Sequence, residues 1–156
     1  MSIEIKISEK RIPYKIAMRY LNKRVEEVKS GTNRELLWIL EHPTTYTAGV
    51  SFNKKEIIDK KIKIVKSNRG GKITLHNPGQ KIVYFVIDLN KRKKDIRKLI
   101  NSIEKSIIQF LKEYKIQSKS DKKNIGIWVK GKKIAAIFLS LTHMPIFFLS
   151  FLDCIL

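Results

Sequence analysis

The sequence predicts an α+β fold, with a mixed β-sheet and packed helices. Two observations lead to this prediction. Short segments alternate apolar and polar residues, as strands do, and two longer segments repeat apolar residues at helical spacing. The two kinds of segment mix irregularly, without the strict strand–helix repetition of a parallel α/β fold. With 156 residues, 43% of them hydrophobic, the chain suits one domain with one core.

The predicted elements follow in chain order. They are a strand at 3–7, a helix from Pro13 to Gly31, strands at 36–40, 62–65 and 81–89, a helix from about Lys93 to Tyr114, and a hairpin of 125–129 and 133–138. Proline suits the first turn of a helix and glycine its end. The segment 81–89 is almost entirely apolar, which is typical of a strand covered on both faces. The helix at 93–114 has isoleucine and leucine on one face and lysines on the other.

The charge is strongly positive, because 33 Lys and Arg residues stand against 14 Asp and Glu, a net charge of +19. The lysines are scattered along the chain, whereas nucleic-acid proteins more often concentrate arginine and aromatic residues on one face. Two interpretations remain open: biased composition of the source genome, and attraction to an acidic partner. The one cysteine, Cys154, excludes an internal disulfide and fits a reducing compartment. The first residues contain no apolar run of a signal peptide, so we expect a cytoplasmic protein.

The segment 69–80, R-G-G-K-I-T-L-H-N-P-G-Q, is the most informative for chemistry. The adjacent Gly70 and Gly71 permit backbone angles closed to other residues, and their amides could converge on a carbonyl or carboxylate. Arg69 adds a charged donor, Thr74 a hydroxyl, and His76 an imidazole for hydrogen bonding or proton transfer. An ordinary β-hairpin with a Gly-Gly loop explains the same residues equally well. The segment by itself therefore leaves both interpretations open.

Five segments together resemble the octanoyl-acyl-carrier-protein:protein octanoyltransferases of lipoate biosynthesis, in the biotin and lipoate protein ligase superfamily. The segment at 69–80 is similar to the family's R-G-G-x-x-T-x-H-x-P-G-Q signature. The other four, in the family's order, are L-L-W-I-L-E-H-P at 36–43, Y-T-A-G at 46–49, D-L at 88–89, and G-I-W-V with K-I-A-A at 126–129 and 133–136. The resemblance covers roughly residues 13–137 and implies a biotin/lipoate ligase catalytic-domain fold.

The resemblance implies a reaction and a set of site residues. The family transfers an octanoyl group from acyl carrier protein to a lysine of lipoyl domains, through a thioester on a cysteine. Lys133 matches the family lysine that stands beside this cysteine, where an ammonium lowers the pKa of the thiol. By the same resemblance the substrate-binding residues are Arg69, Gly70, Gly71, Lys72, Ile73, Thr74, Leu75, His76, Ala136 and Ile137. The expected partners are octanoyl-acyl carrier protein and the lipoyl domains of 2-oxoacid dehydrogenases and of the glycine cleavage H protein.

The resemblance ends after Ile137. Phe138 stands where the family has glycine, and the following residues match neither the family's H-G-x-A-L-N nor its P-C-G, which holds the nucleophile. Cys154 follows Asp153, and a neighbouring carboxylate raises the pKa of a thiol, which disfavours a nucleophile. We therefore expect a partial catalytic domain at 1–137, incomplete at its C-terminus through truncation or a frameshift, and a divergent apolar tail at 138–156. A milder departure is Asn77, which replaces the family glycine and tolerates left-handed backbone angles.

Other functions stay open at this point. An octanoyltransferase whose activity is impaired by the missing cysteine segment is the preferred hypothesis. The first alternative is a non-catalytic remnant that binds the octanoyl group or acyl carrier protein, and the second, nucleic-acid binding, rests on charge alone. We expect no cofactor and no metal site, because three scattered histidines and one cysteine have no ligand spacing. His143, Pro145 and Asp153 interrupt the apolar tail, so we expect no membrane span either.

Overall fold

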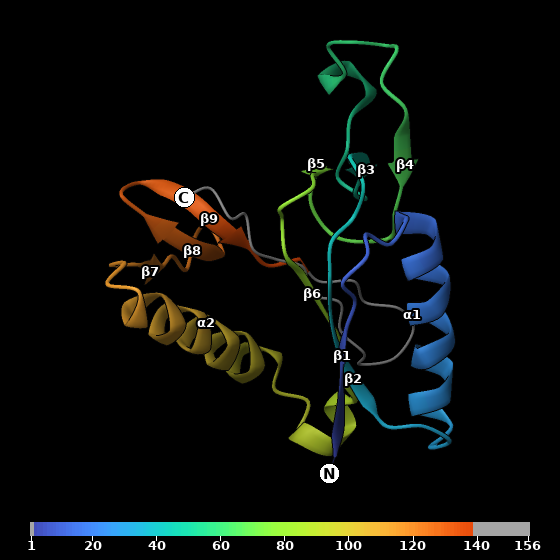
Figure 1. The fold of residues 1–156 in the computed structure, drawn as a ribbon, viewed down its shortest axis with the longest axis vertical. Helices are drawn as coiled ribbons and strands as arrows, with labels where there is room; N and C mark the ends of the chain where they lie inside the picture. Colours follow the sequence, from blue (N-terminus) through green and yellow to red (C-terminus); the bar gives the residue numbers. More distant parts are fainter. Residues whose placement is uncertain (1, 139–156) are drawn as a thin grey trace.

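The chain forms three small sheets and two α-helices in the part that the structure describes (Figure 1). The structure is a computed structural model, and it describes residues 2–138. The elements are β1 Ile3–Ile7, α1 Tyr14–Lys29, β2 Glu35–Leu40, β3 Thr45–Ala48, the 3-10 turn η1 Lys54–Glu56, β4 Ile64–Lys66, β5 Ile73–His76, β6 Ile82–Val86, the 3-10 turn η2 Leu89–Arg92, α2 Ile96–Glu113, β7 Lys119–Ser120, β8 Gly126–Val129 and β9 Lys132–Ala136.

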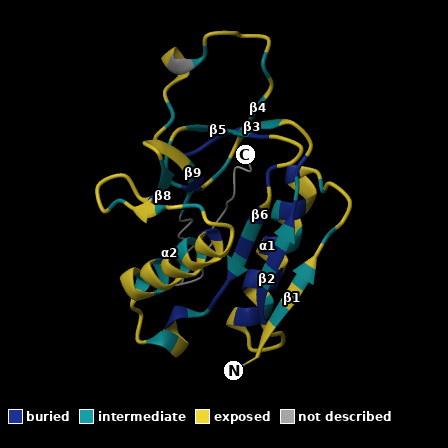
Figure 2. Ribbon diagram, turned by 60° about the vertical axis from the view of Figure 1, so that its left-hand side comes forward, coloured by how far each residue is buried: buried dark blue, intermediate teal, exposed yellow. Residues whose placement is uncertain are grey.

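The first sheet has the order β1-β2-β6 and carries the main core. β1 is parallel to β2, with α1 as the connection between them, and β6 is antiparallel to β2. The apolar stripe of α1 packs on one face of this sheet, where Ala17 and Leu21 are fully buried against Leu36 and Ile82. Figure 2 shows the buried face of α1 turned toward β2 and β6. Burial of this stripe explains why the helix forms where the 3.6-residue period predicts it.

The second sheet, β4-β3-β5, continues the strands of the first. The chain passes from β2 into β3 through Pro43, and from β5 into β6 through Pro78, so the same two segments pair twice in antiparallel fashion. Proline has no N–H to donate to a ladder, and the pairing is interrupted where the two prolines lie. The single mixed sheet expected from the sequence is therefore divided into two separate ladders. The connection from β3 to β4 projects away from the rest of the molecule (Figure 1).

The third unit consists of α2 and the sheet β7-β8-β9. Its small core joins Leu111 of α2 to Ile127 of β8 and Ala135 of β9. The apolar stripe of α2 is less covered than that of α1, because Phe110 and Tyr114 remain 48% and 65% exposed. Neither helix of the described part combines the length and the apolar character that crossing a bilayer requires.

The α+β class and both predicted helices are confirmed, as are the strands expected near 3–7, 36–40, 62–65 and 81–89 and the hairpin after residue 125. Three short strands, β3, β5 and β7, are not among the predicted elements. Strands of two to four residues show no clear alternation, and only their pairing with distant partners defines them. Of the predicted tail at 138–156, residues 139–156, with Cys154, lie outside the described residues.

Candidate active site

The turn between β4 and β5 is held against the end of β3 by three backbone hydrogen bonds. The amides of Gly49, Val50 and Ser51 donate to the carbonyl oxygens of Lys72, Arg69 and Gly71, at 2.9, 3.0 and 3.2 Å. Gly49 makes this approach possible. A Cβ atom at this position would lie 2.3 Å from the carbonyl oxygen of Gly71, closer than atoms in van der Waals contact can come. The turn at 69–72 is thus fixed in place by the glycine that directly follows β3.

Gly71 itself has a φ of +85°, in the left-handed region that favours glycine. Its missing side chain also leaves room for Phe138, whose ring would lie 3.3 Å from a Cβ atom placed there. The same ring packs against the guanidinium of Arg69, 4.5 Å from the ring centroid. Phe138, the first residue after the last segment that resembles the family, therefore covers the glycine turn.

Arg69 is the centre of the candidate site, buried to 8% exposure. Its guanidinium donates to the carbonyl oxygens of Gly70, Thr47 and Lys72 and to the Thr47 hydroxyl, each at 2.9 Å. Burial lowers the pKa of Arg69, and the opposing influences come from the phenols of Tyr14 and Tyr84, with no carboxylate among them. Its Nε has no hydrogen-bond partner in the described residues. A buried cation that is held by neutral oxygens favours an anion or a developing oxyanion beside it.

Two histidines and two tyrosines surround this arginine. His42 and His76 lie edge to face at 5.4 Å between ring centroids, and Tyr14 stacks on His76 at 5.8 Å. Nδ1 of His42 donates to the Ile12 carbonyl, which only accepts, so Nε2 accepts from the Tyr84 hydroxyl at 2.8 Å. Burial also lowers the pKa of His42 and raises that of Tyr84. The ring of His42 is therefore a fixed, neutral acceptor that orients Tyr84.

His76 is also neutral at physiological pH. Burial lowers its pKa to about 4, helped by the His42 ring and by the charge of Arg69, and the Gln80 side chain, which favours the protonated ring, opposes the shift. Its Nε2 lies 3.3 Å from the Thr47 hydroxyl, while Nδ1 has no partner within hydrogen-bond geometry in the described residues. The site thus combines one buried cation with a neutral imidazole. This combination suits a polar, uncharged carbonyl whose oxygen becomes negative during reaction.

The predicted substrate-binding run, 69–76, is divided between two faces of the sheet β4-β3-β5. Alternation along β5 puts Thr74 and His76 on the face of Thr47 and Arg69, and puts Ile73 and Leu75 on the opposite face. Lys72 and Ile73 line a separate hollow on that opposite face. Only part of the run is therefore gathered around the buried arginine.

Lys133 lies on β9 with an exposed side chain. Its ammonium donates to the Ile125 carbonyl at 3.1 Å and lies 5.0 Å from the Trp128 ring centroid, while its aliphatic part passes over Gly126. Five residues of extended strand, about 16 Å, separate Lys133 from Phe138. Ala136 is half-buried and Ile137 is buried, and the next residue, Phe138, packs on the glycine turn. That Lys133 faces the turn across a shared acyl cavity stays a prediction.

Sequence reasoning missed several residues that form this site. Thr47 and Gly49 belong to the Y-T-A-G segment, and their place in that segment was the available signal. Phe138 gave no such signal, because it was interpreted as the start of unrelated sequence. Tyr14 was assigned only to the apolar stripe of α1 and His42 to the end of a strand.

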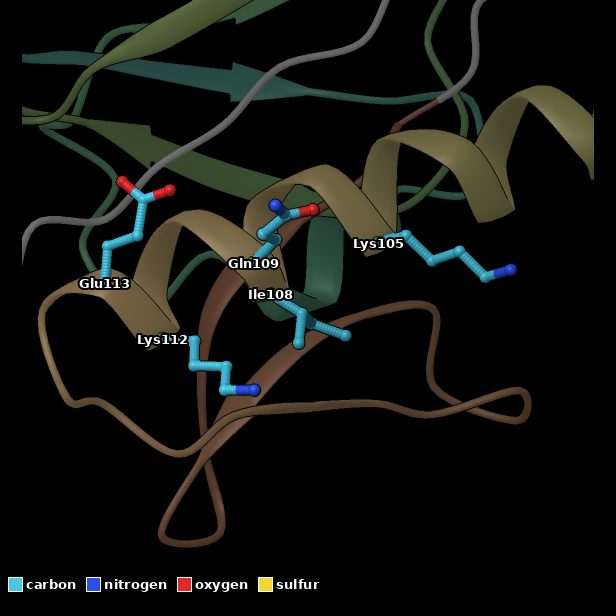
Figure 3. A pocket seen from close by; sticks show the side chains of 5 residues that line it. All are labelled: Lys105, Ile108, Gln109, Lys112 and Glu113. Atoms are coloured by element: carbon cyan, nitrogen blue, oxygen red, sulfur yellow. The ribbon is translucent and has the colours of Figure 1, made fainter.

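A second hollow, of about 610 Å³, lies along α2 (Figure 3). Lys105, Ile108 and Lys112 point to the same side of the helix there, and Gln109 and Glu113 complete the lining. None of these five residues belongs to the predicted site. Among residues 2–138 no group of three or more His, Cys, Asp or Glu side chains could hold a metal ion.

The chain is similar to known proteins over most of its length. Residues 13–144 match the lipoyl protein ligase A/B catalytic domain family. The chain is 41% identical over 129 residues to the octanoyltransferase of Bartonella tribocorum, covering 82% of the chain and 53% of the relative. It is 39% identical over 147 residues to the octanoyltransferase of Anaplasma phagocytophilum, covering 90% and 71%. The chain thus spans about half to two-thirds of the length of these curated relatives.

The fold is similar to that of a solved structure. A bi-partite lipoate protein ligase from Thermoplasma acidophilum, studied with its E2 lipoyl domain, superposes with a TM-score of 0.66 at 14% identity, covering 97% of the chain and 62% of that protein. At this identity the likeness concerns the fold alone.

Proposed function

The chain belongs to the lipoyl protein ligase A/B catalytic domain family, and its sequence relatives are octanoyltransferases. From this premise we propose that it serves octanoyl transfer in protein lipoylation. The donor is octanoyl-acyl carrier protein, and the acceptors are lysines of the lipoyl domains of 2-oxoacid dehydrogenases and of the glycine cleavage H protein. The domain that does this extends from residue 1 to 137, in the cytoplasm, and 138–156 is a divergent tail.

One observation carries the proposal. A buried arginine, which has no carboxylate partner among residues 2–138, lies beside a glycine turn, at the segment where the family signature was found. A thioester carbonyl placed there would put its oxygen near a fixed positive charge, and this charge would stabilise the oxyanion of the tetrahedral intermediate. The neutral imidazole of His76 adds a polar group without adding a second cation. A single cation suits an acyl carbonyl, on which one negative charge develops, better than a phosphate that carries two.

The proposed residue roles follow the family resemblance. The substrate-binding residues are Arg69, Gly70, Gly71, Lys72, Ile73, Thr74, Leu75, His76, Ala136 and Ile137. Lys133 would lower the pKa of a nucleophilic cysteine, which needs an ammonium close by. For this to happen its side chain must leave the Ile125 carbonyl and the Trp128 ring, where its described contacts lie.

We also propose that the 156-residue polypeptide transfers octanoyl groups poorly. Its one cysteine is not in a P-C-G segment, and Asp153 precedes it. The present contacts of the Lys133 ammonium favour the same conclusion, because they leave it bound within its own hairpin. The second candidate function is therefore a non-catalytic module that binds the octanoyl group or acyl carrier protein.

Binding and transfer can be measured separately. The 156-residue chain is mixed with octanoyl-acyl carrier protein; binding is followed by calorimetry, acylation by intact mass, and transfer by the mass of an added lipoyl domain. We expect binding, with little adduct on Cys154 and little transfer. An adduct that passes on to the lipoyl domain would show that the predicted impairment is wrong, and absence of binding would overturn the proposed function.

Substitutions then test the site itself. Arg69→Ala removes the buried cation and should weaken octanoyl binding about tenfold or more, while Arg97→Ala, an exposed arginine of α2, should not. Because Arg69→Ala also removes four hydrogen bonds, circular dichroism must show that the variant is folded. Thr74→Val, which keeps the side-chain shape on the same face of β5, provides a second test with a smaller structural cost.

A further inference from the structure

The sheet β4-β3-β5 has a second, outer face, opposite the face that carries Thr47 and His76. Alternation along the strands puts Tyr46, Ile64 and Ile73 on this face, opposite Thr47 and His76. The chain between η1 and β4 folds over them and encloses a hollow of about 460 Å³. Its lining is Tyr46, Ile57, Ile58, Asp59, Ile62, Ile64, Lys72 and Ile73.

Apolar side chains dominate this hollow although it is open at the surface. Ile58 is fully exposed, and Ile57, Ile62, Ile64 and Ile73 are only half-buried. Monomeric proteins rarely leave several large apolar side chains together in contact with water unless another molecule covers them. In Figure 1 this segment forms the outermost part of the projection between β3 and β4, so a large partner can approach it.

The chain segments that line the hollow, here called its rim, are basic, and Lys72 lines the hollow itself. Residues 54–72 contain seven lysines and only two acidic residues, and all seven lysines are exposed: Lys54, Lys55, Lys60, Lys61, Lys63, Lys66 and Lys72. An apolar hollow with a positive rim matches a protein surface with the opposite arrangement, an apolar side chain surrounded by carboxylates. Such complementarity increases the association rate and suppresses wrong partners.

We propose that this lysine-rimmed hollow is the docking site for an acidic acyl-acceptor domain of the lipoyl type, which inserts an apolar side chain among the isoleucines. The identity of the partner as an acceptor rests on the proposed function. A protein is favoured over a lipid surface because the apolar residues line a concavity that accommodates a side chain, whereas insertion into a bilayer uses a convex apolar surface.

The position of the hollow also suits an acceptor. Lys72 and Ile73 line it and directly follow Gly71, so the edge of the hollow lies about 10 Å or less from the glycine turn by strand geometry. A protein that buries about 800 Å² on its partner covers a patch wider than this separation. A domain seated in the hollow therefore also reaches the edge of the candidate active site.

The chain contains a matched control for the charged rim. Residues 59–61 and 121–123 both read Asp-Lys-Lys, and in both an aspartate Oδ1 accepts a hydrogen bond from the amide two residues later, at 2.9 and 2.8 Å. All four lysines are exposed. Replacing Lys60 and Lys61 with Glu, or Lys122 and Lys123 with Glu, thus makes the same change in net charge in the same local turn.

Binding of a recombinant unlipoylated lipoyl domain of net negative charge to the full chain is measured by calorimetry at low and moderate salt. We expect the Lys60→Glu/Lys61→Glu variant to bind about tenfold more weakly at low salt, with a smaller difference at moderate salt, and the Lys122→Glu/Lys123→Glu variant to bind like wild type. Equal weakening in both variants, or no binding by wild type, would overturn the proposal.

A second pair of variants tests the apolar part. Ile58→Glu places a charge in the hollow and should abolish measurable binding of the domain, whereas Ile5→Glu, on the distant edge strand β1 and 67% exposed, should not. Neither side chain is buried, so both variants should remain folded. If Ile58→Glu instead removes binding to anionic lipid vesicles, or to octanoyl-acyl carrier protein, and leaves domain binding unchanged, the hollow serves that ligand and the proposal is wrong.

The docking site and the proposed function can fail separately. A wild-type chain that binds the lipoyl domain but not octanoyl-acyl carrier protein would contradict the function and leave the docking site standing. A chain that binds octanoyl-acyl carrier protein, while all surface variants bind the domain like wild type, would contradict the docking site alone.

Discussion

Two buried arginines in this molecule have opposite surroundings. Arg24, 5% exposed, donates to Glu4 at 2.6 Å and lies 3.4 Å from a carboxylate oxygen of Glu27. Arg69, 8% exposed, is held by carbonyl and hydroxyl oxygens. Burial alone would lower both pKa values, but Glu4, with Tyr20 and Glu27, raises the pKa of Arg24 overall, while that of Arg69 remains lowered.

This difference separates a structural ion pair from a site. Around Arg24 the positive charge is neutralised within the protein, and the cluster joins β1 to α1. Around Arg69 the neighbouring oxygens accept hydrogen bonds from the guanidinium. The groups that act on its pKa are the phenols of Tyr14 and Tyr84, and none of them is a carboxylate that would neutralise its positive charge. Evolved sites keep such an arrangement where charge develops on a ligand.

The largest expected effect comes from the glycine that holds the Arg69 region together. Gly49→Ala should lower the free energy of unfolding by about 3 kcal/mol or more, because the new Cβ would overlap the Gly71 carbonyl oxygen, 2.3 Å away. Gly31→Ala is the control. It has a φ of +75° and nothing within 4 Å, so it should cost about 1 kcal/mol through backbone strain alone. Urea unfolding measures both, and equal losses would mean that the turn at 69–72 is not clamped.

The pH dependence of stability should distinguish the two regions. Because the folded-state pKa of His76 is about 4, below its ordinary 6.5, the unfolded chain takes up a proton first as pH falls. The stability contributed by neutral His76 is present above pH 6.5 and is lost down to pH 4, by up to about 3 kcal/mol. The hydrogen bond from Arg24 lowers the pKa of Glu4, so its contribution is present above pH 4.5 and is lost only below it.

Two substitutions test which residue causes the loss of stability in each of these two pH ranges. His76→Asn should flatten the stability profile between pH 6.5 and 4, and Glu4→Gln should flatten it only below pH 4.5, both measured by urea unfolding across pH. His42 remains in the His76 variant, and burial lowers its pKa too, so some slope should persist. Parallel profiles for wild type and His76→Asn would contradict a buried, neutral His76.

Replacing each arginine in turn tests the difference between Arg24 and Arg69. Arg69→Met leaves buried carbonyl oxygens without donors and should cost about 2 kcal/mol. Arg24→Met should also destabilise, since it leaves Glu4 and Glu27 without their cation, but their side chains are each 28% exposed and can be hydrated. The decisive measurement is thermal stabilisation by octanoyl-acyl carrier protein: Arg24→Met should keep it and Arg69→Met should lose it. Retention in both variants would separate Arg69 from ligand binding.

The smallest effect is expected at an exposed ion pair between the residue after β2 and the residue before β6. Lys81 lies 2.7 Å from Glu41, which also accepts from the Gly79 amide. Because the lysine side chain is 57% exposed, Lys81→Ala should change the free energy of unfolding by about 0.5 kcal/mol or less. A loss comparable to that of Arg69→Met would mean that surface charge, rather than burial, controls this part of the molecule.

Local pattern predicted most of the secondary structure. The stripe of α1 and the apolar strand β6 were visible because burial repeats at the period of the element. The strands β3 and β5 were not predicted, because four residues show too little pattern and their pairing partners are 18 or more residues away in the chain. The predicted stripe of α2 is real, but the structure covers it only in part, with Leu111 buried and Phe110 exposed.

The candidate site was predicted as a continuous run of residues, and the structure divides that run. Thr74 and His76 share a face with Arg69, while Ile73 lies on the other face with the apolar hollow. A sequence motif preserves order but does not state which side of a sheet each residue occupies once the strand pairs. Phe138 shows the same limit, since it was predicted to begin a divergent tail and yet packs on Gly71 and Arg69.

The sequence by itself therefore determined the class of fold, the family and the segment where the chemistry is expected, because periodicity and motif order are properties of neighbours along the chain. Only the tertiary structure decided that Arg69 is a buried cation without a carboxylate partner, that Gly49 holds the turn, and that a basic hollow lies behind it. These are properties of residues brought together by strand pairing over long distances in sequence. Burial and the nearest charges set the energy of an ionisable group, and both are known only when the chain has folded.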